Sequence, residues 1–190
     1  MASATIKGVA FQSVAADVKA LRRSGAVSEA DLRGAIKSDE MKYLDEEVVP
    51  GLWYPLGTYG RLLDLLCRKE GGDRTEYLIE RGVRAAERMM NQGAYKDFLT
   101  AANRWGERAG QAMVHLAKAL YGGTRWSASY SGEEHTAEIV VEDAGEFPEA
   151  ARYAAQGFVQ VLFKRIEGAE VQVASHRPKA NRIVYSIRRA

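Results

Sequence analysis

Residues 124–189 decide the fold, and they read TRWSASYSGEEHTAEIVVEDAGEFPEAARYAAQGFVQVLFKRIEGAEVQVASHRPKANRIVYSIRR. Polar and apolar residues alternate over 124–130 and again over 135–141, which predicts two strands joined by a short turn. A helix of about 20 residues follows, because Pro148 can open it and Gly168 can end it. Its apolar residues occupy more than one face, so we expect this helix to be covered on two sides.

Two further alternating segments, 169–175 and 182–188, close the chain, with a loop around Pro178 predicted between them. Segment 122–190 therefore has the order strand–strand–helix–strand–strand. Strands joined by short turns pair in antiparallel fashion, so this order predicts an antiparallel sheet with a helix packed on it.

The part of the chain before this segment is mainly helical in its pattern. Apolar residues recur at helical spacing from Phe11 onward, and Ser28 with Asp31 forms a predicted capping box. The stretch Trp53-Tyr54-Pro55-Leu56 is predicted to start a helix, since proline suits the first helical turn. The remaining predicted helices end at glycine pairs or before a change of period, and they cover residues 56–70, 73–90, 95–102 and 105–120.

The whole chain is predicted to form one α+β domain, residues 1–190. Its mainly helical part, 5–121, would pack on the ββαββ part, 122–190. With 190 residues, 46% of them hydrophobic, the chain has the composition of an ordinary globular protein and not of a disordered one.

Charge, cysteine content and hydropathy narrow the environment and the partners. The chain has 27 basic and 25 acidic residues, a balance that does not indicate nucleic acid as a partner. A single cysteine, Cys67, excludes an internal disulfide and suits a reducing cytoplasm. No stretch approaches the roughly 18 apolar residues of a membrane helix, so we expect a cytoplasmic protein without a membrane partner.

The sequence carries no motif typical of catalysis. His115, His135 and His176 are isolated and show no metal-ligand spacing, and there is no phosphate-binding loop or nucleophile elbow. Cys67 lies in a leucine-rich helix, where it is expected to be a buried core residue. We therefore expect a protein that is not an enzyme and that needs no cofactor or metal.

Aromatic and methionine side chains are the better candidates for a binding site. Several fall near the ends of predicted elements or on their inner faces, where they could line an apolar pocket between the helical part and the sheet. An ordinary hydrophobic core is the competing interpretation. The candidate ligand-binding residues are Trp53, Tyr54, Tyr59, Met89, Trp105, Met113 and Trp126.

Basic residues concentrate near the C-terminus, after an acidic first hairpin. They could bind an anion or the phosphates of a nucleic acid. The competing interpretation is an exposed strand edge that charge protects from pairing with another chain. The candidate anion-binding residues are Arg177, Lys179, Arg182 and Arg188.

The order of elements, together with Ile6-Lys7-Gly8, Trp53-Tyr54-Pro55 and Asn103-Arg104-Trp105, resembles the haem-NO-binding-like superfamily. Within it the chain is most similar to an uncharacterised family expanded in myxobacteria, related to the four-vinyl-reductase-type ligand-binding domains. The resemblance covers nearly the whole chain. It implies a regulatory domain that binds a small molecule or a protein and does not catalyse a reaction.

The resemblance does not carry haem binding with it. Haem-binding members use a histidine near the position of Trp105, and His115 comes about three turns later. They also use a Tyr-x-Ser-x-Arg motif on the first hairpin, and 126–130 reads WSASY instead. The cysteines common near the end of four-vinyl-reductase domains are absent from 174–187 as well.

The leading hypothesis is a non-catalytic bacterial sensor or adaptor domain in signalling, which binds a small apolar ligand or a protein partner. Self-association into a homodimer would also be consistent with this role. Two alternatives stay open. One is a haem-binding gas sensor or an enzyme that uses His115. The other is a nucleic-acid-binding regulator that uses the basic C-terminal segment.

Overall fold

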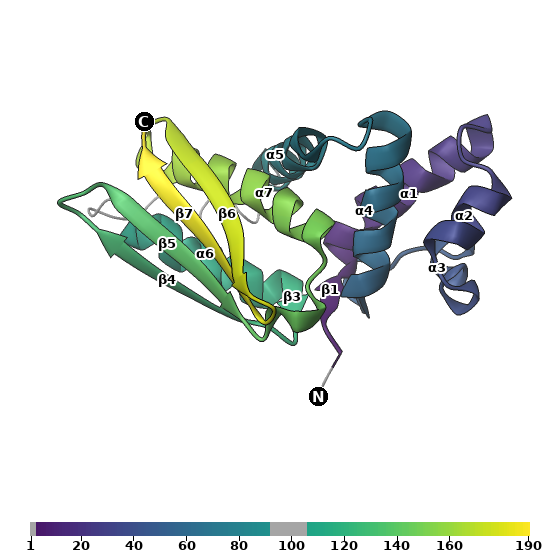
Figure 1. Cartoon of the computed structure of the whole chain (residues 1–190), viewed down its shortest axis with the longest axis horizontal. Helices are drawn as coiled ribbons and strands as arrows, with labels where there is room; N and C mark the ends of the chain where they lie inside the picture. The colour runs from purple at the N-terminus through teal and green to yellow at the C-terminus, as the bar shows by residue number, and fades with distance from the viewer. Residues whose placement is uncertain (1–2, 92–105) are drawn as a thin grey trace.

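The computed structural model describes residues 3–91 and 106–190 (Figure 1). The predicted helix over 95–102 and the candidate residue Trp105 lie outside these residues. In chain order, the elements are β1 (Thr5–Lys7), α1 (Gly8–Ser24), α2 (Glu29–Ala35), η1 (Ser38–Glu40), α3 (Lys42–Asp45), β2 (Trp53–Pro55), α4 (Leu56–Glu70), α5 (Thr75–Asn91), α6 (Glu107–Leu120), β3 (Tyr121–Gly122), β4 (Arg125–Ser131), β5 (Thr136–Glu142), η4 (Ala144–Glu146), α7 (Glu149–Glu167), β6 (Val171–Lys179) and β7 (Arg182–Arg189).

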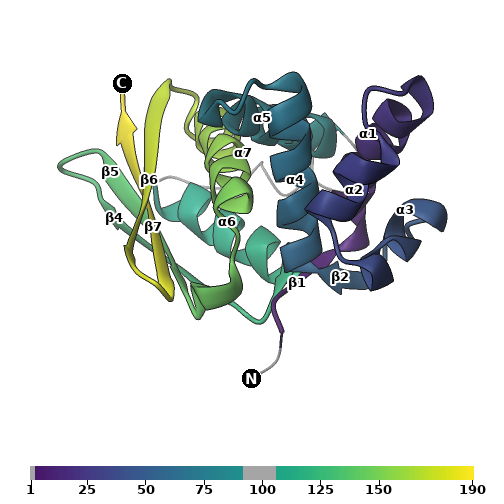
Figure 2. The ribbon, with the colours of Figure 1, turned by 45° about the vertical axis from the view of Figure 1, so that its right-hand side comes forward.

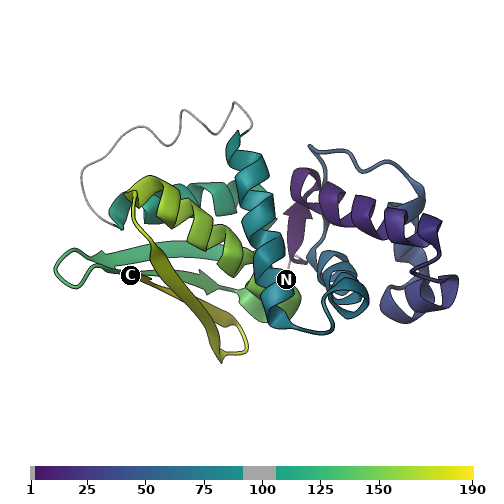
Figure 3. The ribbon, with the colours of Figure 1, turned by 90° about the horizontal axis from the view of Figure 1, so that it is seen from above.

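The C-terminal strands form an antiparallel four-stranded sheet in the order β4-β5-β7-β6, which confirms the predicted ββαββ arrangement. Trp126 lies opposite Val141, and Val141 lies opposite Ile183, so these side chains share one face. All three are buried, because α6 and α7 cover this face (Figure 3). Period-two alternation thus separates a covered face of the sheet from an open one.

One predicted boundary in this sheet is wrong. Strand β6 does not end before a loop at Pro178 but continues to Lys179, with a register shift between His176 and Lys179. Proline has no backbone N–H to give to a neighbouring strand. It is tolerated here because β6 is the edge strand of the sheet and the irregularity falls at this point.

Helix α7 begins after Pro148 and ends at Gly168, whose φ of 64° is left-handed, as the sequence predicts. One side of α7 packs on the sheet and the other crosses α5 (Figure 3). The crossing is close, because a Cβ on Gly82 would lie 1.8 Å from the Ala154 carbonyl oxygen and one on Gly157 would lie 1.9 Å from the Ile79 carbonyl oxygen. The prediction that α7 is covered on two sides is confirmed.

The N-terminal helices form a separate layer in which α1, α2 and α3 lie beside α4 (Figure 2). The capping box of Ser28 and Asp31 is present, with the Asp31 N–H donating to the Ser28 hydroxyl at 3.1 Å. None of the described helices combines the length and the apolar composition needed to cross a membrane.

The stretch Trp53–Pro55 corrects the sequence prediction, because it is a strand and not the start of a helix. It pairs with β1, placing Tyr54 opposite Ile6, and β1 pairs in turn with β3. Pro55 is the residue that precedes the first turn of α4, and the Leu56 N–H donates to the Ala4 carbonyl oxygen at 3.0 Å. The extended conformation arises from pairing with a distant segment, which local propensity does not report.

Candidate functional site

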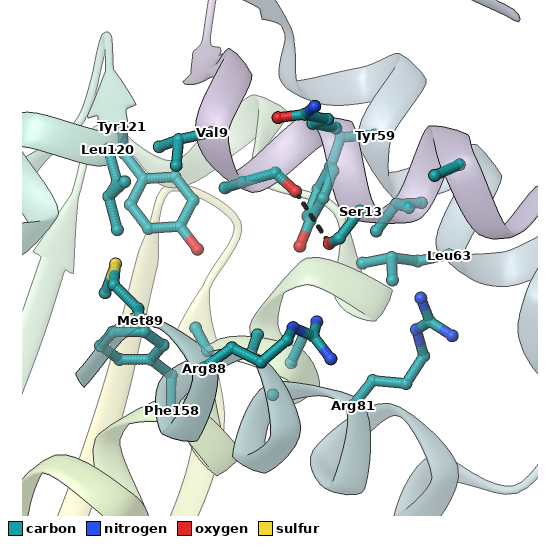
Figure 4. Close-up of a pocket in the computed structure, with 18 residues that line it drawn as sticks. Val9, Ser13, Tyr59, Leu63, Arg81, Arg88, Met89, Leu120, Tyr121 and Phe158 are labelled. Atoms are coloured by element: carbon teal, nitrogen blue, oxygen red, sulfur yellow. Dashed lines mark hydrogen bonds between the residues drawn. The ribbon is translucent and has the colours of Figure 1, made fainter. Parts of the chain in front are cut away.

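A cavity of about 320 Å³ lies where α1, α4, α5 and α7 meet the end of α6 and β3 (Figure 4). This volume is at the lower end of the range for small-molecule sites, and crevices between helices are common places for them. The residues that line the cavity are Val9, Ala10, Gln12, Ser13, Val14, Ala16, Tyr59, Leu63, Arg81, Gly82, Ala85, Arg88, Met89, Leu120, Tyr121, Ala154, Ala155 and Phe158.

Small side chains create the space. Five alanines, on α1, α5 and α7, line the cavity together with Gly82, and their side chains are too short to fill the space between the helices. On α5 the lining residues Arg81, Ala85 and Arg88 follow the spacing of one helical face. The same helix therefore closes one wall of the cavity with two arginines and an alanine between them.

Two tyrosines place their hydroxyl groups in the cavity. Tyr59 comes from α4 and is only 8% exposed, and Tyr121 comes from β3 (Figure 4). Neither hydroxyl has a hydrogen-bond partner among the described residues. Burial raises the pKa of Tyr59 to about 12 and that of Tyr121 well above its ordinary value. Both groups are therefore neutral phenols at physiological pH, able to donate a hydrogen bond to a molecule in the cavity.

The two arginines of the cavity differ in their pairing. Arg81 forms an ion pair with Asp17 of α1 and donates to the Tyr77 hydroxyl at 3.1 Å. Burial acts to lower the pKa of Arg81, but these partners raise it above its ordinary value. Arg88 forms no ion pair or hydrogen bond with any described residue, and no carboxylate is among the described lining residues. Arg88 is an exposed residue, so its guanidinium meets solvent as well as the cavity, and no described lining residue neutralises its charge.

The structure brings together two of the ligand-binding residues expected from the sequence, since Tyr59 and Met89 both line the cavity. Tyr54 and Trp53 do not line it. Tyr54 stacks on Phe11 with ring centroids 4.8 Å apart, and its hydroxyl accepts the Val49 N–H at 2.8 Å. Trp53 is 44% exposed on β2, with the Lys7 ammonium 4.1 Å from its ring centroid.

Met113 and Trp126 are core residues and also lie outside the cavity lining. The Trp126 indole stacks on Tyr121, with ring centroids 5.3 Å apart, and its N–H donates to the Thr124 hydroxyl at 2.9 Å. Trp126 therefore supports the back of Tyr121 without reaching the cavity itself.

The four basic residues expected to bind an anion are not gathered in one place. Arg177 donates to Glu149 at 2.6 Å and to the Phe147 carbonyl oxygen at 2.6 Å, so it holds the start of α7. Arg182 pairs with Glu142 at 3.5 Å. Lys179 lies opposite Arg182 in the β6–β7 hairpin, whereas Arg188 stands about 20 Å further along β7.

The sequence reasoning missed the arginines of the cavity and Tyr121. The available signal was the spacing of Arg81, Ala85 and Arg88, which puts two positive charges and a small residue on one face. Nothing local marks Tyr121, because its position in the cavity depends on the pairing of β3 with β1.

The histidines and the cysteine lie away from the cavity. His115, His135 and His176 are exposed. Cys67 is buried on α4, as expected, with its thiol 3.3 Å from the Arg74 carbonyl oxygen, and burial raises its pKa. Among the described residues no three histidine, cysteine, aspartate or glutamate side chains converge as a metal site would require.

Comparison with solved structures places this arrangement among known folds. A mutant of T. tengcongensis H-NOX is 14% identical, with 97% of each chain covered and a TM-score of 0.62. A mutant of the Fe(II) unliganded H-NOX protein from K. algicida is 11% identical, with 97% of each chain covered and a TM-score of 0.67. A third structure, on the molecular mechanism of H-NOX activation, is 14% identical, covers 97% of this chain and 96% of its own, and has a TM-score of 0.56. No protein-family model and no curated protein matches the sequence.

The chain therefore has the α+β fold of H-NOX domains, the haem-NO-binding-like fold. This confirms the predicted haem-NO-binding-like fold, whereas the similarity to a family expanded in myxobacteria stays a prediction. At 11–14% identity the likeness concerns the fold, and the chemistry of the site rests on the residues of this chain.

The described residues of the cavity do not fit haem. Haem iron in proteins is held by histidine, cysteine, methionine or tyrosine. No histidine lines the cavity, and Cys67 is not part of its lining. Tyr59 and Tyr121 both project into the cavity as phenols, from α4 and from β3, and no histidine or arginine of the described lining that could assist haem ligation is bonded to either hydroxyl. Met89 is the remaining candidate among the described lining residues, and a thioether serves in haem proteins beside a histidine.

Proposed function

We propose that the protein is a non-catalytic sensor domain that binds a small, largely apolar molecule in the cavity between α1, α4, α5 and α7. The observation that carries this proposal is the pair of tyrosine hydroxyls, Tyr59 and Tyr121, which face the cavity without a hydrogen-bond partner among the described residues. Two hydroxyls that face one cavity and bond to no described residue are available to a molecule that enters it, which suits a binding site.

The position of α5 supports a sensing role. Its one face lines the cavity through Arg81, Ala85 and Arg88, and its glycine Gly82 interlocks with α7. A ligand that favours one position of α5 would shift the position of α7 and hence of the sheet that α7 covers. Binding would act by changing the populations of two such arrangements. The fold shared with H-NOX domains is consistent with this role.

The remaining parts of the proposal concern the setting of the protein. We propose that it works in bacterial signalling in the cytoplasm, that it passes its state to a protein partner, and that self-association is one form this contact takes. Nucleic-acid binding is not favoured, because Arg177 and Arg182 of the basic C-terminal segment are already paired with Glu149 and Glu142.

Native mass spectrometry combined with a cavity-filling variant tests the proposal. We expect the purified protein to retain a small molecule or, once emptied, to bind naphthamide in a calorimetric titration. Ala85→Phe places a ring in the cavity and should weaken naphthamide binding at least about 10-fold. Ala20→Phe adds the same ring on an exposed position of α1 outside the cavity and should leave binding unchanged. Unaltered binding in Ala85→Phe, or neither a retained molecule nor saturable binding in the wild type, would contradict the proposal.

Haem-based gas sensing is the second candidate, favoured by the fold alone. Reconstitution of the protein with haem, followed by an absorption spectrum, separates the two. We expect no sharp Soret band that depends on His115, because this side chain is exposed on α6 and outside the cavity lining. A Soret band present in the wild type and lost in His115→Ala would establish the second candidate instead.

A further inference from the structure

The donors and charges around the cavity restrict the chemistry of the molecule that can fill it. This step rests on the proposed function, since it names the class of ligand for the same cavity. The polar groups that such a ligand would meet lie on described lining residues of the cavity.

The described lining has charged donors but no charged acceptor, since its polar side chains are those of Arg81, Arg88, Tyr59, Tyr121, Gln12 and Ser13. The hydroxyls of Tyr59 and Tyr121 stay protonated, and Arg88 offers the N–H groups of its guanidinium. The Ser13 hydroxyl already donates to the Ala10 carbonyl oxygen at 3.4 Å, so its own proton is in use. A ligand that carries hydrogen-bond acceptors therefore suits this wall better than one that carries donors.

The charges of the described lining residues favour an anion over a cation, because Arg81 and Arg88 are basic and none of these residues is acidic. Asp17 neutralises Arg81, and no carboxylate faces Arg88 from the described elements that pack against the cavity. The positive charges of Arg81 and Arg88 both act on Tyr59, where they oppose the effect of burial on the tyrosine pKa. Figure 4 shows the Tyr59 hydroxyl and the Arg88 side chain directed into the same space. One anionic group can thus meet both a charged and a neutral donor.

The rest of the wall is apolar, and this limits the charge that the ligand can carry. Leu63, Leu120, Met89 and Phe158 surround the space beyond the polar groups. A dianion would bring a second negative charge into this surrounding without a partner, and an unpaired buried charge is strongly unfavourable. A single negative charge on an apolar body matches both halves of the wall.

We propose that the cavity binds an apolar monocarboxylic acid, whose carboxylate accepts hydrogen bonds from Arg88 and Tyr59 while its apolar body packs against Leu63, Met89 and Phe158. Charge-assisted hydrogen bonds to arginine are stronger than neutral ones, so the carboxylate supplies specificity as well as affinity. This chemistry defines the ligand by its class, as an alkyl or aryl carboxylate.

Binding of naphthoate and of its uncharged amide, naphthamide, to the emptied full-length protein tests the proposal, because the two probes differ in charge and not in shape. In calorimetric titrations the wild type should bind naphthoate about 10-fold more tightly than naphthamide. Arg88→Ala should abolish this preference. Arg84→Ala, on the same helix one turn earlier and outside the cavity lining, should preserve it. Tyr59→Phe should weaken both probes about 5-fold.

The outcomes separate the two proposals. Equal binding of naphthoate and naphthamide, or a preference for naphthoate that survives in Arg88→Ala, would contradict the proposal of a carboxylate ligand. Either result would still support a cavity that binds a small molecule. Tighter binding of naphthyl phosphate than of naphthoate would contradict the proposal that the ligand carries a single negative charge. Binding of none of the probes would overturn both proposals. Circular dichroism of each variant checks that Arg88→Ala and Arg84→Ala keep the wild-type fold.

Discussion

Helix α5 faces two neighbours in opposite ways. Toward α7 it packs so closely that Gly82 and Gly157 leave no room for a single Cβ atom. Toward α1 it stands back and leaves a cavity of about 320 Å³, bridged at one side by the ion pair of Arg81 with Asp17. One helix thus forms both the tightest crossing and the wall of the cavity in the described part of the chain.

The difference shows that the cavity is not a sign of a loosely packed protein. Cores are close-packed because each missing contact loses dispersion energy. The α5–α7 crossing is packed in this way, since its glycines leave no space for a Cβ atom. The cavity lies next to it because alanines on α1, α5 and α7 occupy positions that larger apolar side chains would fill. A fold that packs this well on one side of α5 supports a binding role for the space on the other.

The largest expected effect comes from adding one methyl group at the crossing. Gly157→Ala should lower the free energy of unfolding by about 3 kcal/mol, since the new Cβ meets the backbone of Ile79 and α5 must move away. In a thermal melt this corresponds to about 6–12 °C. Gly34→Ala is the matched control, because nothing lies within 4 Å of its Cβ position on α2 and it should be neutral or slightly stabilising. Equal melting temperatures for both variants would contradict the close crossing.

The next effect concerns how Tyr59, in the cavity wall, changes the stability of the fold at alkaline pH. Because burial raises the pKa of Tyr59 to about 12, folding favours its protonated form. Its contribution to stability is fully present below pH 10, the ordinary tyrosine pKa, and is lost as the pH rises toward 12. The loss for one such group is about 2–3 kcal/mol. Denaturant unfolding at pH 9, 10 and 11, compared between the wild type and Tyr59→Phe, measures it, and identical pH profiles would mean that water reaches this hydroxyl freely.

A pair of tyrosine substitutions separates the two regions more finely. Tyr54→Phe removes the acceptor of the Val49 N–H and should cost about 1 kcal/mol. Tyr59→Phe removes a hydroxyl that has no partner among the described residues, so its free energy of unfolding near neutral pH should change by less than about 0.5 kcal/mol. Urea denaturation of both variants makes the comparison. A Tyr59→Phe loss as large as that of Tyr54→Phe would show that the hydroxyl is already satisfied without a ligand.

The last comparison concerns filling the cavity. Ala85→Phe should change the free energy of unfolding by less than about 1 kcal/mol, because the ring enters space that the alanine leaves open. Gly82→Ala, three residues earlier, adds far less volume but meets the Ala154 carbonyl oxygen and should cost more. If the larger substitution destabilised the protein more than the smaller one, the space at Ala85 would not be available.

Sequence patterns sufficed for most elements. The alternating strands 124–130 and 135–141, the helix between Pro148 and Gly168 and the capping box at Ser28 rest on periods and end signals that act within a few residues, and the structure confirms them. The prediction for Trp53–Pro55 was wrong, because the extended form of this strand depends on pairing with β1, nearly fifty residues away. Of the described candidate residues, Tyr59 and Met89 lie in the cavity, whereas Trp53 and Tyr54 lie on β2 and Met113 and Trp126 lie in the core outside the cavity lining.

The sequence by itself determined the ββαββ order, the helical N-terminal part and the buried state of Cys67, because local periodicity decides which side of an element avoids water. Tertiary structure alone decided which side chains share the cavity. Tyr59, Arg88 and Tyr121 come from three elements, and they meet because the glycines of α5 and α7 set how closely these helices approach while alanines hold α1 apart. Distances between elements follow from packing across the whole fold, and no local pattern in the chain encodes them.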